Sequence, residues 1–88
     1  MLMNNIYNWK IIPTDPDRAA FLGQLGHSYP MVTSNIYKIH IGRVELISGT
    51  VIIPVEPIEG TWDRYLALYR PKIYKELIKY GILKPYAT

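Results

Sequence analysis

The chain has 88 residues and no cysteine, which excludes a disulfide framework, a thiol nucleophile and a cysteine-ligated metal. A chain of this length has room for one hydrophobic core, so we expect a single domain over residues 1–88. The formal charge is +3, but residues 1–60 carry four Lys or Arg against five Asp or Glu, whereas residues 61–88 carry six against two. The sequence contains no apolar run of about 18 residues, the length needed to cross a membrane. We therefore expect a cytoplasmic protein whose positive charge lies in its last third.

The first expected element is a strand over residues 6–12. Its residues alternate, with Tyr7, Trp9 and Ile11 on one side and polar residues on the other, which is typical of a half-buried strand. Pro13 ends this strand, because proline has no amide hydrogen to donate to a sheet.

A short helix is expected next, beginning at Pro16 and continuing through Leu22. Asp15 is a residue type that caps helices, and Pro16 suits the first helical position because its fixed φ matches the helix. Glycine commonly ends a helix in a left-handed conformation, so we expect this helix to end near Gly23 or Gly26.

Two further strands are indicated in the middle of the chain. Residues 31–41 are β-like, with Tyr37 and Ile39 expected on one face, and residues 44–47 form the next apolar run. Gly42 lies between these runs and is interpreted either as the turn between two strands or as a bulge within one.

A hairpin and a third strand of the group follow. Ser48 and Gly49 have the composition of a two-residue hairpin turn. Residues 50–55 are rich in β-branched side chains, which favour a strand. Pro54 near its end predicts that this strand lies at the edge of the sheet, where a missing donor costs least.

The last third of the chain is a basic amphipathic helix by its pattern. Pro71 removes one helical hydrogen bond, so the segment is either one helix kinked there or two helices, the second beginning at Pro71. The apolar stripe keeps its phase through the proline, which favours the kinked helix. Gly81 ends the helix. Large apolar residues recur at steps of three and four, namely Trp62, Leu66, Tyr69, Ile73, Leu77 and Tyr80.

These elements predict an α+β domain with the order β-α-β-β-β-α. In this arrangement, a small, mainly antiparallel sheet is covered on one face by the long C-terminal helix.

Neither a metal site nor a catalytic site is indicated. The two histidines, His27 and His40, are too far apart in the sequence for a short-spaced ligand pair. Asp15 and Asp17 flank a proline at the expected helix start, where capping explains both carboxylates without catalysis. We expect no cofactor and no enzymatic activity, with a small enzyme of unknown type as the third alternative.

The preferred hypothesis is a non-enzymatic interaction protein that self-associates or docks on a protein partner. Eight Tyr, two Trp and one Phe are more large aromatic residues than so small a core can bury. Tyr65, Tyr74 and Tyr80 broaden the helical stripe beyond what a small sheet covers. We expect these three residues, or the strand edge at Pro54, to contact the partner, since excess aromatic surface marks interaction sites.

The alternative hypothesis is a nucleic-acid-binding accessory protein. Its cations would contact phosphates, and a compact Ile-, Tyr- and Lys-rich chain also suits a viral or plasmid accessory role. A solvated helix face explains the same residues without a partner. The candidate phosphate-binding residues are Arg64, Arg70, Lys72, Lys75 and Lys79.

Overall fold

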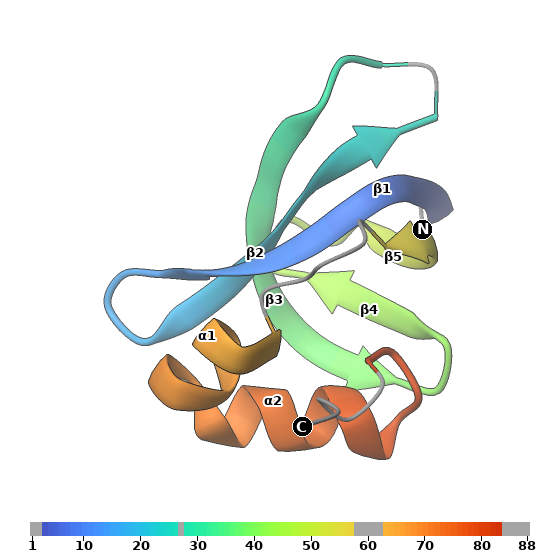
Figure 1. Ribbon diagram of the computed structural model, residues 1–88. Helices are drawn as coiled ribbons and strands as arrows, with labels where there is room; N and C mark the ends of the chain where they lie inside the picture. The colour runs from blue at the N-terminus through green and yellow to red at the C-terminus, as the bar shows by residue number, and fades with distance from the viewer. Residues whose placement is uncertain (1–2, 27, 58–62, 84–88) are drawn as a thin grey trace.

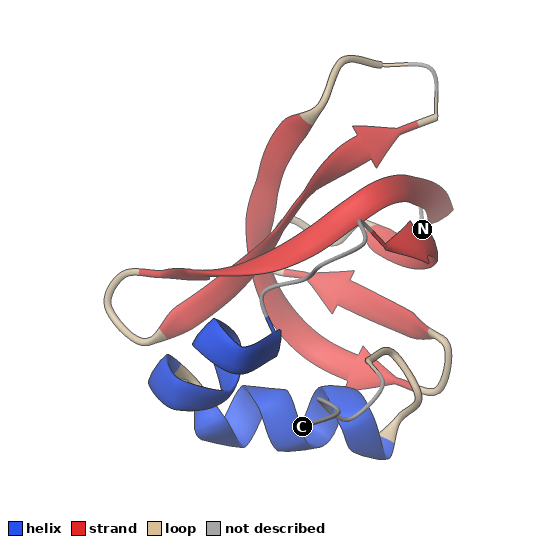
Figure 2. Ribbon diagram, viewed as in Figure 1, coloured by secondary structure: helices blue, strands red, loops and turns tan. Residues whose placement is uncertain are grey.

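Five strands are followed by two short helices in the computed structural model, which describes residues 3–26, 28–57 and 63–83 (Figures 1 and 2). The predicted α+β class is confirmed. The elements are β1 (Met3–Thr14), β2 (Arg18–Leu25), β3 (Met31–His40), β4 (Arg43–Leu46), β5 (Val51–Pro57), α1 (Asp63–Tyr69) and α2 (Pro71–Lys79).

The strands form a closed barrel in simple chain order. Each strand is antiparallel to the next, and β5 closes the barrel by pairing in parallel with β1. The parallel closure follows because five strands that alternate in direction leave the first and last pointing the same way. The helices lie together under one end of the barrel, and the β2–β3 hairpin projects from the opposite end (Figure 2).

The helix predicted from Pro16 to Leu22 is wrong, because residues 16 and 17 lie in a turn and the rest of the segment belongs to strand β2. Residues 15–17 form the turn from β1 to β2, a role for which Asp and Pro are equally suited. Ala19, Ala20 and Phe21 are fully buried, since β2 is paired with β1 on one side and β3 on the other. Barrel pairing therefore overrides local helical signals, and the element order is β-β-β-β-β-α-α.

Two register shifts change which residues face the core. In β1 the shift falls between Tyr7 and Lys10, around Asn8, whose φ of 48° is left-handed. Trp9 is buried as expected, but Tyr7 is displaced from the core and half-exposed. A second shift in β3 turns Tyr37 outward. At such a register shift, an extra residue in one strand reverses which side chains face the core beyond that point. A strict two-residue period does not predict this reversal.

The prediction that the strand of Pro54 lies at a sheet edge is wrong, because β5 is paired with β4 on one side and with β1 on the other. Pro54 itself lies opposite Ile6 of β1, beyond the two residues of β5, Val51 and Ile52, that pair with β4. The register of the parallel pair shifts immediately after this point, between Ile6 and Tyr7. Proline is accommodated at such an irregularity because the regular ladder is already interrupted.

The two glycine turns are now defined. Gly42, with φ of 71°, lies in the connection between the paired residues His40 and Arg43, so it makes a turn and not a bulge. A turn lies at Ser48 and Gly49 as predicted, but its loop has three residues, 47–49, and not two. The amide of Leu46 donates to the Thr50 carbonyl over 2.8 Å and the amide of Gly49 donates to the Leu46 carbonyl over 2.9 Å. Gly49 has a left-handed φ of 92°, which favours glycine.

The core fills the barrel and is closed at one end by the helices. Inside, the rings of Trp9 and Phe21 meet edge to face with centroids 5.4 Å apart. Leu66 of α1 and Leu77 of α2 are fully buried against this cluster. The helices therefore act as a lid whose apolar residues complete the core.

The single kinked helix is wrong, and the alternative of two helices is confirmed. Arg70, with φ of −137° and ψ of 63°, lies outside the helical region and separates α1 from α2, because proline disfavours a helical conformation in the residue before it. Pro71 occupies the first turn of α2, where its missing amide hydrogen has no intrahelical partner to lose. The break changes the phase of the stripe, so Tyr69 is half-exposed, whereas Trp62 lies outside the described residues.

Replacing Pro71 with Ala is expected to lower the free energy of unfolding by about 0.4–1 kcal/mol, because a compatible proline restricts the unfolded chain. Thermal and urea unfolding of the two proteins would measure the difference. An increase in stability would contradict the assignment of Pro71 to the start of α2.

Candidate interaction surfaces

The tyrosines predicted to contact a partner are only partly available. Tyr74 and Tyr80 are half-buried and pack against the hydrophobic core from the helix side. The side chain of Tyr65 lies outside the described residues. Part of the predicted aromatic surplus is therefore used to cover the end of the barrel.

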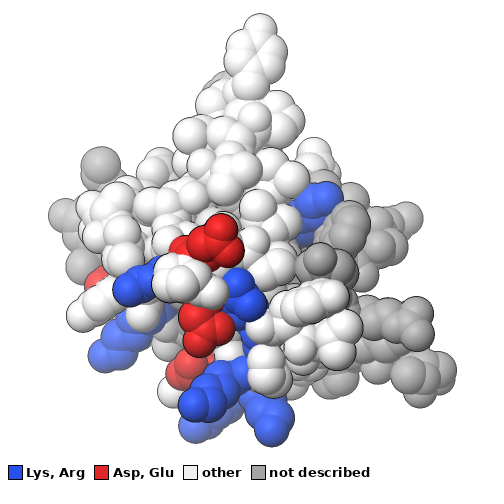
Figure 3. Space-filling view, turned by 90° about the vertical axis from the view of Figure 1, so that its left-hand side faces the viewer, with Lys and Arg blue, Asp and Glu red and all other residues white. Residues whose placement is uncertain are grey.

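Exposed apolar side chains gather instead on the hairpin of β2 and β3, which we call the arm (residues 22–26 and 28–35). Tyr29 is 90% exposed and Val32 51% exposed, with Met31 between them also exposed. The sequence has no Lys, Arg, Asp or Glu between Arg18 and Lys38. The projection at the top of Figure 3 accordingly shows no charged side chain.

The arm also carries a strand edge that no described strand covers. Residues 31–34, which we call the β3 edge, pair with β2 through Met31 and Val32, whereas pairing with β4 begins only at Ile36. On the side of β3 that faces β4, the backbone hydrogen bond nearest to this edge runs from the Ile47 amide to the Asn35 carbonyl over 2.8 Å. Ser34 still reaches across this side through its hydroxyl, which donates to the Ser48 hydroxyl over 3.0 Å. Within the described residues, residues 31–34 have no backbone pairing with β4.

Sequence reasoning missed this surface, although one of its two defining features was visible in the sequence. The long uncharged interval was visible in the composition of the segment. The unpaired edge was not, because it depends on β4 being six residues shorter than β3. Short neighbouring strands leave part of a longer strand without a partner.

Arg70, predicted to bind phosphate, is instead engaged within the protein. Its side chain is 14% exposed and donates to the carbonyl oxygens of Thr14 and Arg18, each over 2.8 Å, and of Tyr69 over 2.7 Å. The carboxylate of Asp17 lies 3.9 Å away. Arg70 therefore ties the break between the helices to the turn between β1 and β2.

The three candidate lysines remain at the surface. Lys72, Lys75 and Lys79 are exposed and share the face of α2 opposite the buried Leu77. The Lys79 ammonium lies 5.5 Å from the centroid of the Tyr80 ring. The side chain of Arg64 lies outside the described residues. In Figure 3, acidic side chains lie among the cations, which dilutes the positive field of this face.

Other kinds of site find no support in the described part of the chain. His27 lies outside it, and among the residues inside it no group of three or more His, Cys, Asp or Glu could hold a metal ion. None of its helices is long and apolar enough to span a membrane. Comparison with protein-family models, curated proteins and solved structures gave no match.

Proposed function

We propose that this protein is a non-enzymatic interaction domain that self-associates through the β3 edge. The observation that carries the proposal is a strand edge, residues 31–34, that is paired on one side only within the described chain and is flanked by exposed apolar side chains. An unpaired edge presents backbone donors and acceptors that another strand can use.

The chemistry of the β3 edge favours a second copy of the same chain. Proteins that must stay monomeric protect such edges with charged residues, and Lys38 is the first charged residue after the edge. Two copies related by a two-fold axis would pair their β3 edges antiparallel, which brings identical residues close together. The absence of charge means that this pairing meets no like-charge repulsion.

The side chains of the arm would add apolar contact to the backbone pairing. Tyr29, Met31 and Val32 are exposed beside the β3 edge and would lose water contact when two arms join. A different protein that offers a strand to the same edge is the runner-up partner. The half-buried Tyr74 and Tyr80, with Tyr65, remain proposed contacts of any interface formed by the helices.

Sedimentation equilibrium tests the proposal. We expect the natural chain to have about twice its mass of 10.2 kDa at micromolar concentration. Val32→Lys would place two ammonium groups near the two-fold axis and should weaken dimerisation at least about tenfold. Val55→Lys is the matched control, since Val55 is 44% exposed and lies on β5, which is two strands from β3 in the barrel order.

The two valine variants also separate the alternatives. A dimer that resists Val32→Lys but dissociates on Val55→Lys would place the interface at β5 and contradict the arm assignment. A clean monomer of the natural chain at high concentration would contradict self-association altogether. Both variants should keep the thermal transition of the natural chain, because each changes an exposed side chain.

We also propose nucleic-acid binding through α2 as the second candidate function, because Lys72, Lys75 and Lys79 share one exposed face. Changing all three to Glu should abolish affinity for DNA or RNA of any sequence. Replacing them one at a time with Gln should flatten the salt dependence by about 0.7–0.9 units of slope per lost phosphate contact. Fluorescence anisotropy with a labelled duplex and a labelled single strand, each in a salt series, would measure both effects.

Val55→Glu, at an exposed position of β5, is the charge control for the lysine series, and it should leave binding to the α2 face largely unchanged. If the natural chain binds no more tightly than about 10⁻⁴ M in moderate salt, the lysines serve solubility. That result would remove nucleic acid as a partner while leaving the self-association proposal intact.

A further inference from the structure

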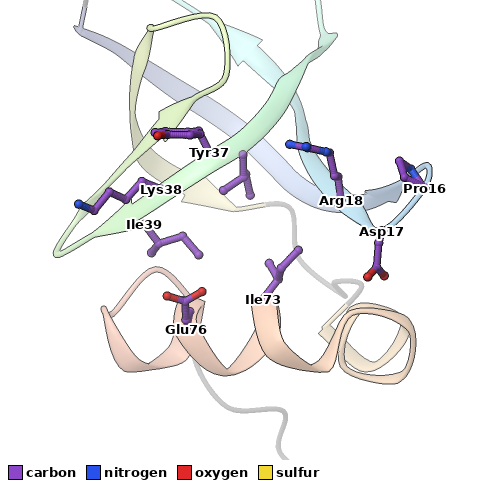
Figure 4. Close-up of a pocket in the computed structure, with 9 residues that line it drawn as sticks. Pro16, Asp17, Arg18, Tyr37, Lys38, Ile39, Ile73 and Glu76 are labelled. Atoms are coloured by element: carbon purple, nitrogen blue, oxygen red, sulfur yellow. The ribbon is translucent and has the colours of Figure 1, made fainter.

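A groove lies between the outer wall of the barrel and helix α2, at the end of the molecule opposite the arm (Figure 4). Its main part has a volume of about 460 Å³ and runs between β3 and α2. A second hollow of about 300 Å³ continues it toward the start of α2. Asp17 and Ile73 line both parts, so the groove is continuous.

The floor of the groove is apolar. Ile36 and Ile39 reach it from β3, and Ile73 faces them from α2. Tyr37 stands at the rim with 65% of its surface exposed, because the register shift in β3 turns it outward. The groove thus has the aliphatic floor and the exposed aromatic ring that a flat organic ring can pack against.

Charged groups of opposite sign stand on opposite sides of this floor. Arg18 and Lys38 lie on the barrel side of the groove, and Glu76 lies on the helix side (Figure 4). Arg18 is opposite Tyr37, since each is two residues from the paired Ala20 and Asn35 on its strand.

None of these three charged side chains has an ion pair or hydrogen bond with another described residue. Asp17 differs, because it faces Arg70 at 3.9 Å. Arg18, Lys38 and Glu76 are therefore free to contact a ligand that enters the groove.

We propose that this groove binds a nucleoside phosphate. The base would lie on the isoleucine floor beside Tyr37, and its N–H groups would donate to the Glu76 carboxylate, which can only accept. The phosphate would lie on the barrel side, where Arg18 supplies charge-assisted hydrogen bonds. A volume of about 460 Å³ is within the range of small-ligand sites. This site is independent of self-association at the arm.

Amide chemical-shift mapping with defined probes tests the proposal. Adenosine 5′-monophosphate or guanosine 5′-monophosphate should shift the amides of residues 36–39 and 73–76 in a saturable way, with a Kd of about 1 mM or lower. Adenosine, which lacks the phosphate, and ribose 5-phosphate, which lacks the base, should each bind at least about tenfold more weakly. This result would show that tight binding requires both the base and the phosphate of the nucleotide.

Three substitutions assign the contacts. Arg18→Gln and Glu76→Gln should each weaken binding of the preferred nucleotide about fivefold or more, because each removes a charged partner. Tyr37→Leu keeps apolar volume but removes the ring, and should weaken binding about threefold or more. Lys79→Gln, on the outer face of α2, should leave the affinity unchanged. Amide spectra of the free variants check that each is folded.

Several results would overturn the nucleotide site. These are the absence of saturable shifts from both nucleotides up to about 10 mM, equal binding of ribose 5-phosphate, or shifts confined to the lysines of α2. A single-stranded oligonucleotide that binds far more tightly than the mononucleotides and shifts residues well beyond the groove would also overturn it. The ligand would then be a nucleic-acid strand.

Discussion

Replacing Arg70 with Ala is expected to lower the free energy of unfolding by about 2–4 kcal/mol, measured by urea denaturation. Hydrogen bonds to charged groups contribute about 1.5–3 kcal/mol each and are not additive within one side chain. Arg70 makes three of them, to the carbonyl oxygens of Thr14, Arg18 and Tyr69. Asp17 adds little, because its side chain is largely in water.

Two further variants separate the geometry of Arg70 from its charge. Arg70→Lys keeps the charge but cannot reach three separate carbonyls in a planar fork, so it should recover less than half of the loss. Lys72→Ala, at an exposed position of the same segment, should change stability by no more than about 0.5 kcal/mol. If Arg70→Ala is as mild as Lys72→Ala, the contacts of Arg70 do not hold the helices to the barrel.

Replacing Leu77 with Ala is expected to cost about 2–5 kcal/mol, the range for large-to-small changes in a well-packed core. Leu77 is fully buried and is the residue by which α2 closes the barrel end. In a domain of this size the loss is a large part of the total stability. Thermal unfolding should show a transition lowered by about 10 °C or more.

Leu68→Ala is the matched control for the core variant. Leu68 lies on α1 and is 72% exposed, so its truncation should change stability by no more than about 0.5 kcal/mol. Equal effects of the two leucine substitutions would mean that α2 does not complete the core. In a Trp62→Phe background, where Trp9 is the one tryptophan of the sequence, retention of the near-ultraviolet tryptophan signal in Leu77→Ala would show that the strands survive loss of the lid.

Much of the strand pattern could be predicted from local sequence, because turn chemistry is local. Gly42 and the Ser48–Gly49 turn separate runs of β-branched residues, and these runs became β3, β4 and β5. The segment after Asp15 could not be read in the same way. Its alanines suit a helix, and only its pairing with the neighbouring strands β1 and β3 on both sides makes it a strand.

Barrel closure itself leaves no local signal. Pro54 indicates an edge when strands are considered singly, yet closure pairs its strand with β1, almost fifty residues earlier. The role of Arg70 is hidden for the same reason, since its hydrogen-bond partners Thr14 and Arg18 are more than fifty positions away. Composition predicted a surplus of apolar surface, but its place on the arm depends on the unequal lengths of β3 and β4.

The central claim, that two copies pair through the β3 edge, is tested most directly by isotope-filtered nuclear Overhauser measurements on a mixture of labelled and unlabelled chains. Antiparallel pairing about a two-fold axis predicts contacts across the interface between residues 31–34 of the two copies, since directly opposed Cα atoms lie about 4.5–5.5 Å apart. These contacts should disappear in Val32→Lys and persist in Val55→Lys. Intermolecular contacts that involve α2 or β5 and leave residues 31–34 silent would contradict the claim.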